Sequence, residues 1–480
     1  MKSVERNRTT GRDKRADRRR KADAPGQVLL GWVALMIVLA LTLRNGAHEP
    51  PMWSLLCLAT LLLFAVQVVF DALLGLRLPA RAAVLVALPY VAVLAWLLVQ
   101  SLPNLTPGLA HPFWAAAPDG ALPTISAHPD AGRQVVMRLA CYGMLFWIFL
   151  RSADAATEGG YAYIQAIALF STALAIYGFV TLSIGYNLLL GQEQVATIMQ
   201  ASFLNRNTYA TFAVFGVLAN LTAYARAVSG SRSRDGLVAL RDFLEAFFSS
   251  GWIYAFGTLV GLAAVAMTLS RGGVAAGAVG VAVLIWGLYH GARGASEMKL
   301  GRLVIPLVIF VFVAVFMTSG VLARLAPIET ELRSTIFRHV LAGALDRPLL
   351  GHGAGTYPEA SRFYMPLELA RSDTQWAHNS YLENAFEFGL PAAALFFAAL
   401  GVIGWRLFQG TRTRRRNQAI PAFALACFVA AAVHASVDFS LQFPAIAALF
   451  AAILGVGWAQ SFSTRRGEPG KARRPRVDEL

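Results

Sequence analysis

The chain has 480 residues, of which 56% are hydrophobic and 14% are charged, and its formal net charge is +15. The apolar residues come in long uninterrupted runs, a pattern that excludes an ordinary soluble globule and indicates a protein whose solvent is the bilayer. The basic residues gather in the two tails and in short connections between apolar runs, which is typical of topology signals. We therefore expect membrane lipid, and no nucleic acid, as the surroundings of this chain.

A charged segment of 26 residues opens the chain, and we expect it to be a disordered cytoplasmic tail without a signal-peptide cleavage site. Apolar runs of about 20 residues then alternate with loops, and each run is long enough to cross about 30 Å of hydrocarbon as a helix. We predict an all-α polytopic membrane protein with about 12 transmembrane helices. The predicted spans are 27–44, 53–74, 83–102, 134–150, 161–184, 208–225, 252–269, 274–290, 303–319, 388–405, 419–436 and 443–459.

Lys and Arg are concentrated in every second connection between the spans, one of which begins at Arg151. By the positive-inside rule these connections and both termini are cytoplasmic. The opposite side then receives three long segments near 103–133, 185–207 and 320–387, and loops of this length are usually functional or disordered. The resulting divisions are a tail at 1–26, nine spans within 27–319, a partly helical outer loop at 320–387, three spans within 388–459 and a basic cytoplasmic tail at 460–480.

The motif Asn205-Arg206-Asn207 stands at the outer mouth of the sixth span. A cation flanked by two amides at a helix start offers charge-assisted donors, which suit an anionic phosphate. An interfacial arginine beside an asparagine that caps the helix would explain the same residues. The sequence leaves both interpretations open.

A second candidate is Arg271, in a tight outer turn Ser270-Arg271-Gly272 between two apolar helices. A cation at the membrane boundary is costly unless it faces a polar cavity or an anion. Its outward position, against the positive-inside trend, favours ligand binding, whereas a clamp on helix carbonyls is the structural alternative.

The long outer loop contains Arg338 and a glycine-rich stretch, Gly351 to Gly355, that ends near Tyr357. No strand precedes these glycines, so a dinucleotide-binding fold is rejected. They either form a turn through which backbone N–H groups approach a ligand, or they end a helix predicted at 334–346, and the second interpretation is favoured.

The motif His378-Asn379 leads into the tenth span, and a neutral imidazole there could accept a proton from an attacking hydroxyl near pH 7. A lone interfacial histidine is often structural, but several arginines assigned to the same membrane face favour catalysis. His434 and Asp438 are four residues apart at the end of the eleventh span, so we expect them to share a helix face and to act as a supporting pair.

No metal or other cofactor is predicted. The outer loops contain no H-E-x-x-H, carboxylate cluster or D-x-D pattern. The cysteines at 57, 141 and 427 lie inside apolar runs and form no C-x-x-C pair, so neither a disulfide framework nor a zinc site is indicated.

In order, spacing and topology these motifs resemble the bacterial O-antigen ligase and O-antigen polymerase superfamily, from about residue 85 to about residue 458. The resemblance implies a metal-independent glycosyltransferase of the bacterial inner membrane whose active site faces the periplasm. Its donor would be a glycan linked to undecaprenyl pyrophosphate, and its acceptor a hydroxyl group, with lipid A–core as the preferred acceptor. Relatives instead use a second lipid-linked repeat or a protein hydroxyl.

The resemblance also implies roles for individual residues. Arg206 and Arg271 match the arginines that bind the diphosphate, His378 matches the general base, and Arg338 matches a loop arginine that positions donor or acceptor. The remaining expected substrate-binding neighbours are Asn205, Asn207, Asn379 and Tyr357. A lipid-linked glycan transporter remains the alternative from a different class, although it would require polar or broken helices near mid-membrane and, often, repeated halves.

Overall fold

The computed structural model describes residues 24–103, 107–156, 158–193, 198–228, 236–290, 322–366, 369, 375–414 and 416–462. Among these residues, nine helices are long and apolar enough to cross a membrane. They are α2 (Ala24–Thr42), α3 (Pro50–Leu74), α4 (Leu78–Gln100), α5 (Pro129–Ala155), α6 (Tyr161–Ile184), α7 (Arg206–Ala227), the run of α8 (Gly236–Ala246), η4 (Phe247–Gly251) and α9 (Trp252–Met267), α10 (Arg271–His290) and α16 (Leu390–Thr413). Two shorter apolar helices are α17 (Ala419–Ala435) and α18 (Pro444–Ala459).

The predicted all-α polytopic fold is confirmed, because these nine long and two short helices coincide with all the predicted spans except 303–319. That span and most of both predicted tails lie outside the described residues. The short elements are η1 (Asn45–Ala47), η2 (Pro107–Leu109), η3 (Pro112–Ala116), the antiparallel pair β1 (Tyr186–Asn187) and β2 (Gln192–Glu193), α12 (Leu322–Asp346), α13 (Tyr357–Ala360), η5 (Ser361–Phe363), α15 (Ser380–Phe388) and η6 (Ser440–Gln442).

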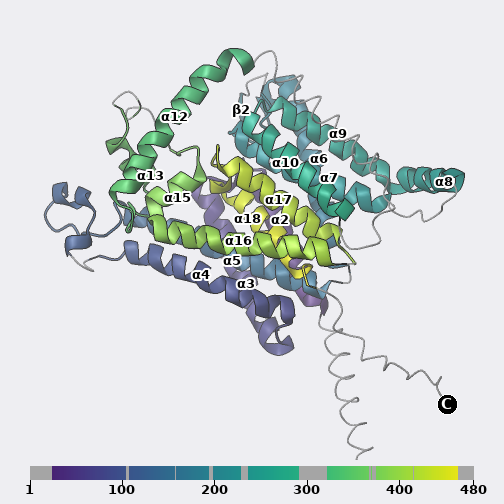
Figure 1. Cartoon of the computed structure of the whole chain (residues 1–480), viewed down its shortest axis with the longest axis horizontal. Helices are drawn as coiled ribbons and strands as arrows, with labels where there is room; N and C mark the ends of the chain where they lie inside the picture. Colours follow the sequence, from purple (N-terminus) through teal and green to yellow (C-terminus); the bar gives the residue numbers. More distant parts are fainter. Residues whose placement is uncertain are drawn as a thin grey trace, which may run out of the picture.

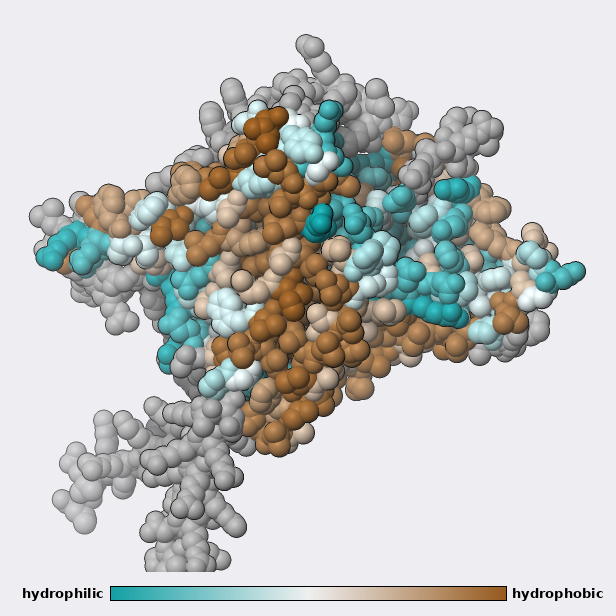
Figure 2. Space-filling view, turned by 180° about the vertical axis from the view of Figure 1, so that it is seen from behind, coloured by the Kyte–Doolittle hydropathy of each residue, from teal (hydrophilic) through white to brown (hydrophobic). Residues whose placement is uncertain are grey.

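The centre of the bundle is formed by α7 and α18. Every residue of α18 is buried, and a Cβ at its Gly455 would collide with the backbone oxygen of Phe146 in α5, so these two helices pack backbone to backbone. Half of its residues are Ala or Gly, and such small side chains let neighbouring helix backbones approach closely in a membrane, which explains its central position. By contrast, α3 and α4 expose leucines such as Leu62, Leu73 and Leu85. Figure 2 shows a broad hydrophobic band with hydrophilic residues on both sides of it, as a lipid-facing surface requires.

The connecting elements lie at two opposite ends of the bundle (Figure 1). The elements α12, α13 and α15, from the predicted loop at 320–387, gather at one end, and α8 projects from the other. Residues assigned to one side of the membrane from the pattern of charges are therefore together in space.

The segment around α12 and α15 is a packed structure with a small core of its own. Ile336, Val340 and Ala344 of α12 are buried against Phe386 of α15. α12 ends at Asp346, as the prediction of a helix at 334–346 requires. The glycines that follow approach other backbone: Gly351 has a φ of 67°, and a Cβ there would lie 2.5 Å from the nitrogen of Gly389. They thus fit a turn against the end of α15.

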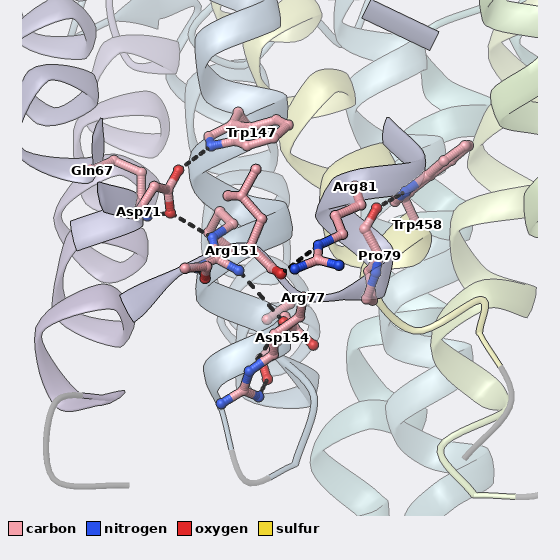
Figure 3. Close-up of polar contacts among 12 residues, drawn as sticks. Gln67, Asp71, Arg77, Pro79, Arg81, Trp147, Arg151, Asp154 and Trp458 are labelled. Carbon is pink, nitrogen blue, oxygen red and sulfur yellow. Dashed lines mark hydrogen bonds and ion pairs between the residues drawn. The ribbon is translucent and has the colours of Figure 1, made fainter. Parts of the chain in front are cut away.

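The connection that was predicted to begin at Arg151 begins later in the structure. α5 continues to Ala155, so Arg151 lies within the helix and is only 3% exposed. Its Nε donates to Asp71 at 2.6 Å and its Nη2 donates to the oxygen of Gly75 at 3.1 Å, while Trp147 donates to the other oxygen of Asp71 at 2.6 Å (Figure 3). The guanidinium therefore ties the end of α3 and the turn that follows it to α5.

Candidate functional site

A small cavity lies where four segments meet at the end of the bundle that carries α12. It has about 20 Å³ of free space, room for about one water molecule. Its lining residues are Arg206, Asn207, Leu269, Ser270, Arg271, Gly272, Arg333, His434 and Val437. Three arginines that are far apart in the sequence thus meet at one point, and the described residues that line the cavity include no carboxylate.

Arg206 is placed by the start of α7. The side-chain oxygen of Asn205 accepts hydrogen bonds from the backbone nitrogens of Asn207 at 2.8 Å and Thr208 at 3.1 Å. Asn205 is therefore the helix cap, and capping leaves Arg206 as the first helical residue, at the cavity. The two interpretations of this motif are compatible, because the cap positions the cation.

Arg271 is placed in the same way at the start of α10. The hydroxyl of Ser270 accepts a hydrogen bond from the nitrogen of Gly273 at 3.1 Å. Gly272 allows close packing, since a Cβ there would lie 2.9 Å from Val437 and 3.0 Å from the ring of His434. The N-termini of α7 and α10 both meet the cavity, and each adds the partial positive charge of a helix start.

The end of α17 and the segment that follows it form another wall of the cavity. Nδ1 of His434 is 2.7 Å from the hydroxyl of Thr211, and Asp438 accepts a hydrogen bond from the amide of Asn207 at 2.9 Å. Asp438 also accepts hydrogen bonds from the backbone nitrogen of Ser440 at 2.9 Å and from its hydroxyl. The prediction that His434 and Asp438 share a helix face is wrong, because α17 ends at Ala435 and Asp438 lies beyond it. Each instead supports α7 separately.

Arg333, rather than Arg338, reaches the cavity from α12. The Nη1 of Arg333 donates to the oxygen of Val437 at 3.1 Å, whereas Arg338 is exposed and its Nη2 lies 3.4 Å from the hydroxyl of Thr335. Five residues on an α-helix correspond to a rotation of roughly 140°, so the two arginines face different ways. Sequence reasoning did not select Arg333. The signal was its position three residues before Ile336, on the buried face of α12.

His378 lies beside the cavity without lining it. Its ring packs edge-on against Phe439, with 4.9 Å between ring centroids. The hydroxyl of Ser380, two residues after His378, donates to the backbone oxygen of Asp438 at 3.1 Å. The side chain of the same Asp438 accepts the hydrogen bond from Asn207 at the cavity. One stretch of chain, 437–439, thus contacts both the arginine cavity and the candidate base.

Asn379 and Tyr357, both predicted to bind substrate, have structural contacts in the segment around α15. The side chain of Asn379 caps α15 by accepting hydrogen bonds from the nitrogens of Tyr381 and Leu382, both at 3.0 Å. Tyr357 has no exposed surface and packs in the small core with Phe386. Burial raises the pKa of its hydroxyl, which stays protonated. Tyr357 is therefore a packing residue, a correction to its predicted role.

The chemistry of the cavity suits a multiply charged phosphate group. A guanidinium is always charged and presents a rigid fork of donors, and three of them with two helix starts gather positive charge at one point. Because the free space is small, a diphosphate would enter with a movement of arginine side chains or would project only some of its oxygens between them.

The comparisons with known proteins agree with this chemistry. Residues 256–397 match the family model described as O-antigen ligase. Over these residues the resemblance to the O-antigen ligase and polymerase superfamily is confirmed. The matched segment includes Arg271, Arg333 and His378, while Arg206 and His434 come from outside it. No curated protein matches the chain. The chain is thus a multi-pass membrane protein whose residues 256–397 match a family of glycosyltransferase-like enzymes.

Proposed function

We propose that the protein is a metal-independent O-antigen ligase of the bacterial inner membrane. It takes a glycan from undecaprenyl pyrophosphate and transfers it to a hydroxyl of lipid A–core on the periplasmic face. The observation that carries this proposal is the meeting of Arg206, Arg271 and Arg333 at one cavity, beside the segment that carries His378.

In this mechanism the arginines hold the pyrophosphate of the donor. As the bond between the anomeric carbon and the phosphate oxygen breaks, the electron pair stays with that oxygen, and negative charge grows on the leaving group. Arg206, Arg271 and Arg333 stabilise this charge without needing to rearrange during the reaction. The Arg338 guanidinium is exposed on α12, and its role is to orient the donor or the acceptor outside the cavity.

His378 acts as the general base on the acceptor. Its neutral ring takes the proton of the acceptor hydroxyl while that oxygen forms its bond to the anomeric carbon. The sugar next to the pyrophosphate would lie over residues 437–439, between the arginines and the histidine. Direct displacement inverts the anomeric centre, and no Asp or Glu of the motifs is assigned as a covalent nucleophile.

The test is transfer in vitro with purified protein in nanodiscs, a defined lipid-linked glycan and lipid A–core. His378→Ala and Arg271→Ala should each lower the rate by about 10²-fold or more while the protein stays folded. Arg271→Lys should also be poor, because an ammonium cannot reproduce the bidentate fork. The control is Arg133→Ala, since Arg133 pairs with Asp130 at 2.8 Å at the start of α5 and does not line the cavity. Full activity of His378→Ala would refute the mechanism.

Two further measurements in the same assay test the identity of the acceptor and the independence from metal. Turnover with lipid A–core supports a ligase, whereas turnover only with a second lipid-linked repeat or with a protein acceptor assigns a polymerase or a protein glycosyltransferase. Activity should persist in a chelator, and strict dependence on Mg²⁺ would refute metal independence.

The periplasmic placement is tested by compartment reporters fused after residues 235, 295, 360 and 480. The expected order is in, in, out and in, following the distribution of basic residues. A cytoplasmic signal at 360 would contradict the placement of the whole site.

A further inference from the structure

Glu383 is a buried carboxyl group next to the candidate base that the mechanism above does not use. It lies on α15 and is only 3% exposed. One of its oxygens accepts a hydrogen bond from the backbone nitrogen of Ala377 at 2.8 Å, and the other accepts one from the side-chain amide of Gln442 at 3.1 Å. Ala377 directly precedes His378, and Gln442 belongs to η6, just after the segment that borders the arginine cavity.

The backbone at His378 needs such support. His378 has a φ of 54°, a left-handed conformation that residues other than glycine rarely adopt and that persists only where the surroundings hold it. On the other side of Ala377, the ring of Trp376 stacks on Phe439 with 4.4 Å between centroids. The two neighbours that precede His378 are thus attached to the 439–442 segment, one by stacking and one through Glu383.

We propose that Glu383 is a positioning residue for His378, which fixes the peptide leading into the histidine against the segment that borders the arginine cavity. This inference rests on the proposed function, since it assigns a cause to the orientation of the proposed base. Glu383 touches neither the donor nor the acceptor. Its role is to hold the Ala377 N–H and the Gln442 amide at the same time.

The contacts predict which substitution can replace the carboxyl group. A glutamine at 383 can accept from Ala377 with its oxygen, and the amide of Gln442 can turn so that its oxygen accepts from the new NH₂ group. A leucine of similar size offers no acceptor, so it leaves the Ala377 N–H and the Gln442 amide without this partner. Burial and the neighbouring Glu387 raise the pKa of Glu383, which agrees with a carboxyl group that acts through hydrogen bonds more than through its charge.

The experiment compares Glu383→Leu and Glu383→Gln in the nanodisc transfer assay. We expect Glu383→Leu to lower kcat by about 10²-fold with the KM for the lipid-linked donor nearly unchanged, because the arginine cavity stays intact. Glu383→Gln should restore kcat to within about threefold and leave the acidic limb of the pH profile of kcat in place. The control is Glu387→Leu, one turn later on α15, which removes a buried carboxyl that bonds to the nitrogen of Tyr357 at 3.0 Å. It should keep most of kcat.

Three outcomes would overturn the inference. Glu383→Leu could keep the wild-type kcat, Glu383→Gln could lose as much kcat as Glu383→Leu, or Glu387→Leu could lose as much as Glu383→Leu. If Glu383→Leu does not fold, Gln442→Leu removes the second anchor and leaves the carboxyl in place; it should lower kcat by about tenfold, and an unchanged kcat would refute the proposal. His378→Ala, measured in parallel, separates the two ideas. Loss of activity in His378→Ala with full activity in Glu383→Leu refutes the positioning role alone.

Discussion

Acidification from pH 7 to pH 5 should loosen the contact between η3 and the turn that follows α12, because a pair of buried histidines forms it. The nitrogen of Phe113 donates to Nδ1 of His111 at 3.2 Å, which leaves the proton of that ring on Nε2. Nε2 of His111 lies 2.9 Å from Nδ1 of His352, and Nε2 of His352 lies 3.0 Å from the oxygen of Gly343. A carbonyl can only accept, so this chain of hydrogen bonds holds when both rings are neutral.

Burial is the largest cause that lowers the pKa of both rings. For His111, burial together with the charges of Arg347 and His352 brings the pKa to about 3. For His352, the hydrogen bond to the oxygen of Gly343 raises the pKa and Arg347 lowers it, and Asp346 raises the pKa of both rings. A histidine with a depressed native pKa contributes stability that is complete above the unfolded pKa of about 6.5 and is lost as the pH falls below it. For His111 alone the loss at pH 5 is about 2 kcal/mol, since native His111 is still unprotonated there.

Hydrogen exchange of the whole protein in nanodiscs measures this effect. After correction for intrinsic exchange rates, protection in 109–116 and 343–352 should fall by about 30-fold between pH 7 and pH 5, the ratio that corresponds to about 2 kcal/mol. His111→Gln removes the titrating ring, and its protection should depend much less on pH. Equal pH dependence in His111→Gln and in the wild type would refute this explanation, as would wild-type protection that does not change.

Two other substitutions test features of the fold and of the cavity. Arg333→Ala should lower transfer by about 10²-fold and Arg338→Ala by much less, because only Arg333 lines the cavity; the reverse order would contradict the orientation of α12. Arg151→Ala should destabilise the protein by about 3 kcal/mol, since it leaves the largely buried Asp71 carboxylate without its cation and with only the neutral donors Trp147 and Gln67, and thermal unfolding in detergent measures this. Arg77→Ala is its control: that side chain is 47% exposed and 3.7 Å from Asp154, so it should cost about 1 kcal/mol at most, and a similar loss in both variants would count against the buried pair.

The hydrophobic runs were sufficient to predict the described spans, because a helix in lipid must satisfy its own backbone and therefore needs a long apolar stretch. Helix ends were harder to predict. We expected the eleventh span to carry Asp438 on its helix face, yet α17 ends at Ala435 and Asp438 lies beyond it, where its carboxylate accepts hydrogen bonds from the nearby nitrogen of Ser440 and from the amide of Asn207 in α7. Ser and Asp can favour either a turn or a helix face, and the contact with α7 is not visible in the local sequence.

The same limit applies to the candidate site. Arg206 and Arg271 stand at helix starts with visible capping residues, and the structure brings these two together. The choice between Arg333 and Arg338 depended on which face of α12 is buried, and the role of Glu383 depended on a contact with Gln442, 59 residues later in the chain. Local patterns identify the charged groups, but tertiary packing decides which of them meet.

The central position of α18 has a consequence for biosynthesis. It is the last of the described helices to leave the ribosome, but it packs against α2, α5 and α17 in the middle of the bundle. The earlier spans therefore reach their native packing only after this helix has been inserted between them. A premature stop before Pro444 would remove the centre of the protein rather than trim its edge.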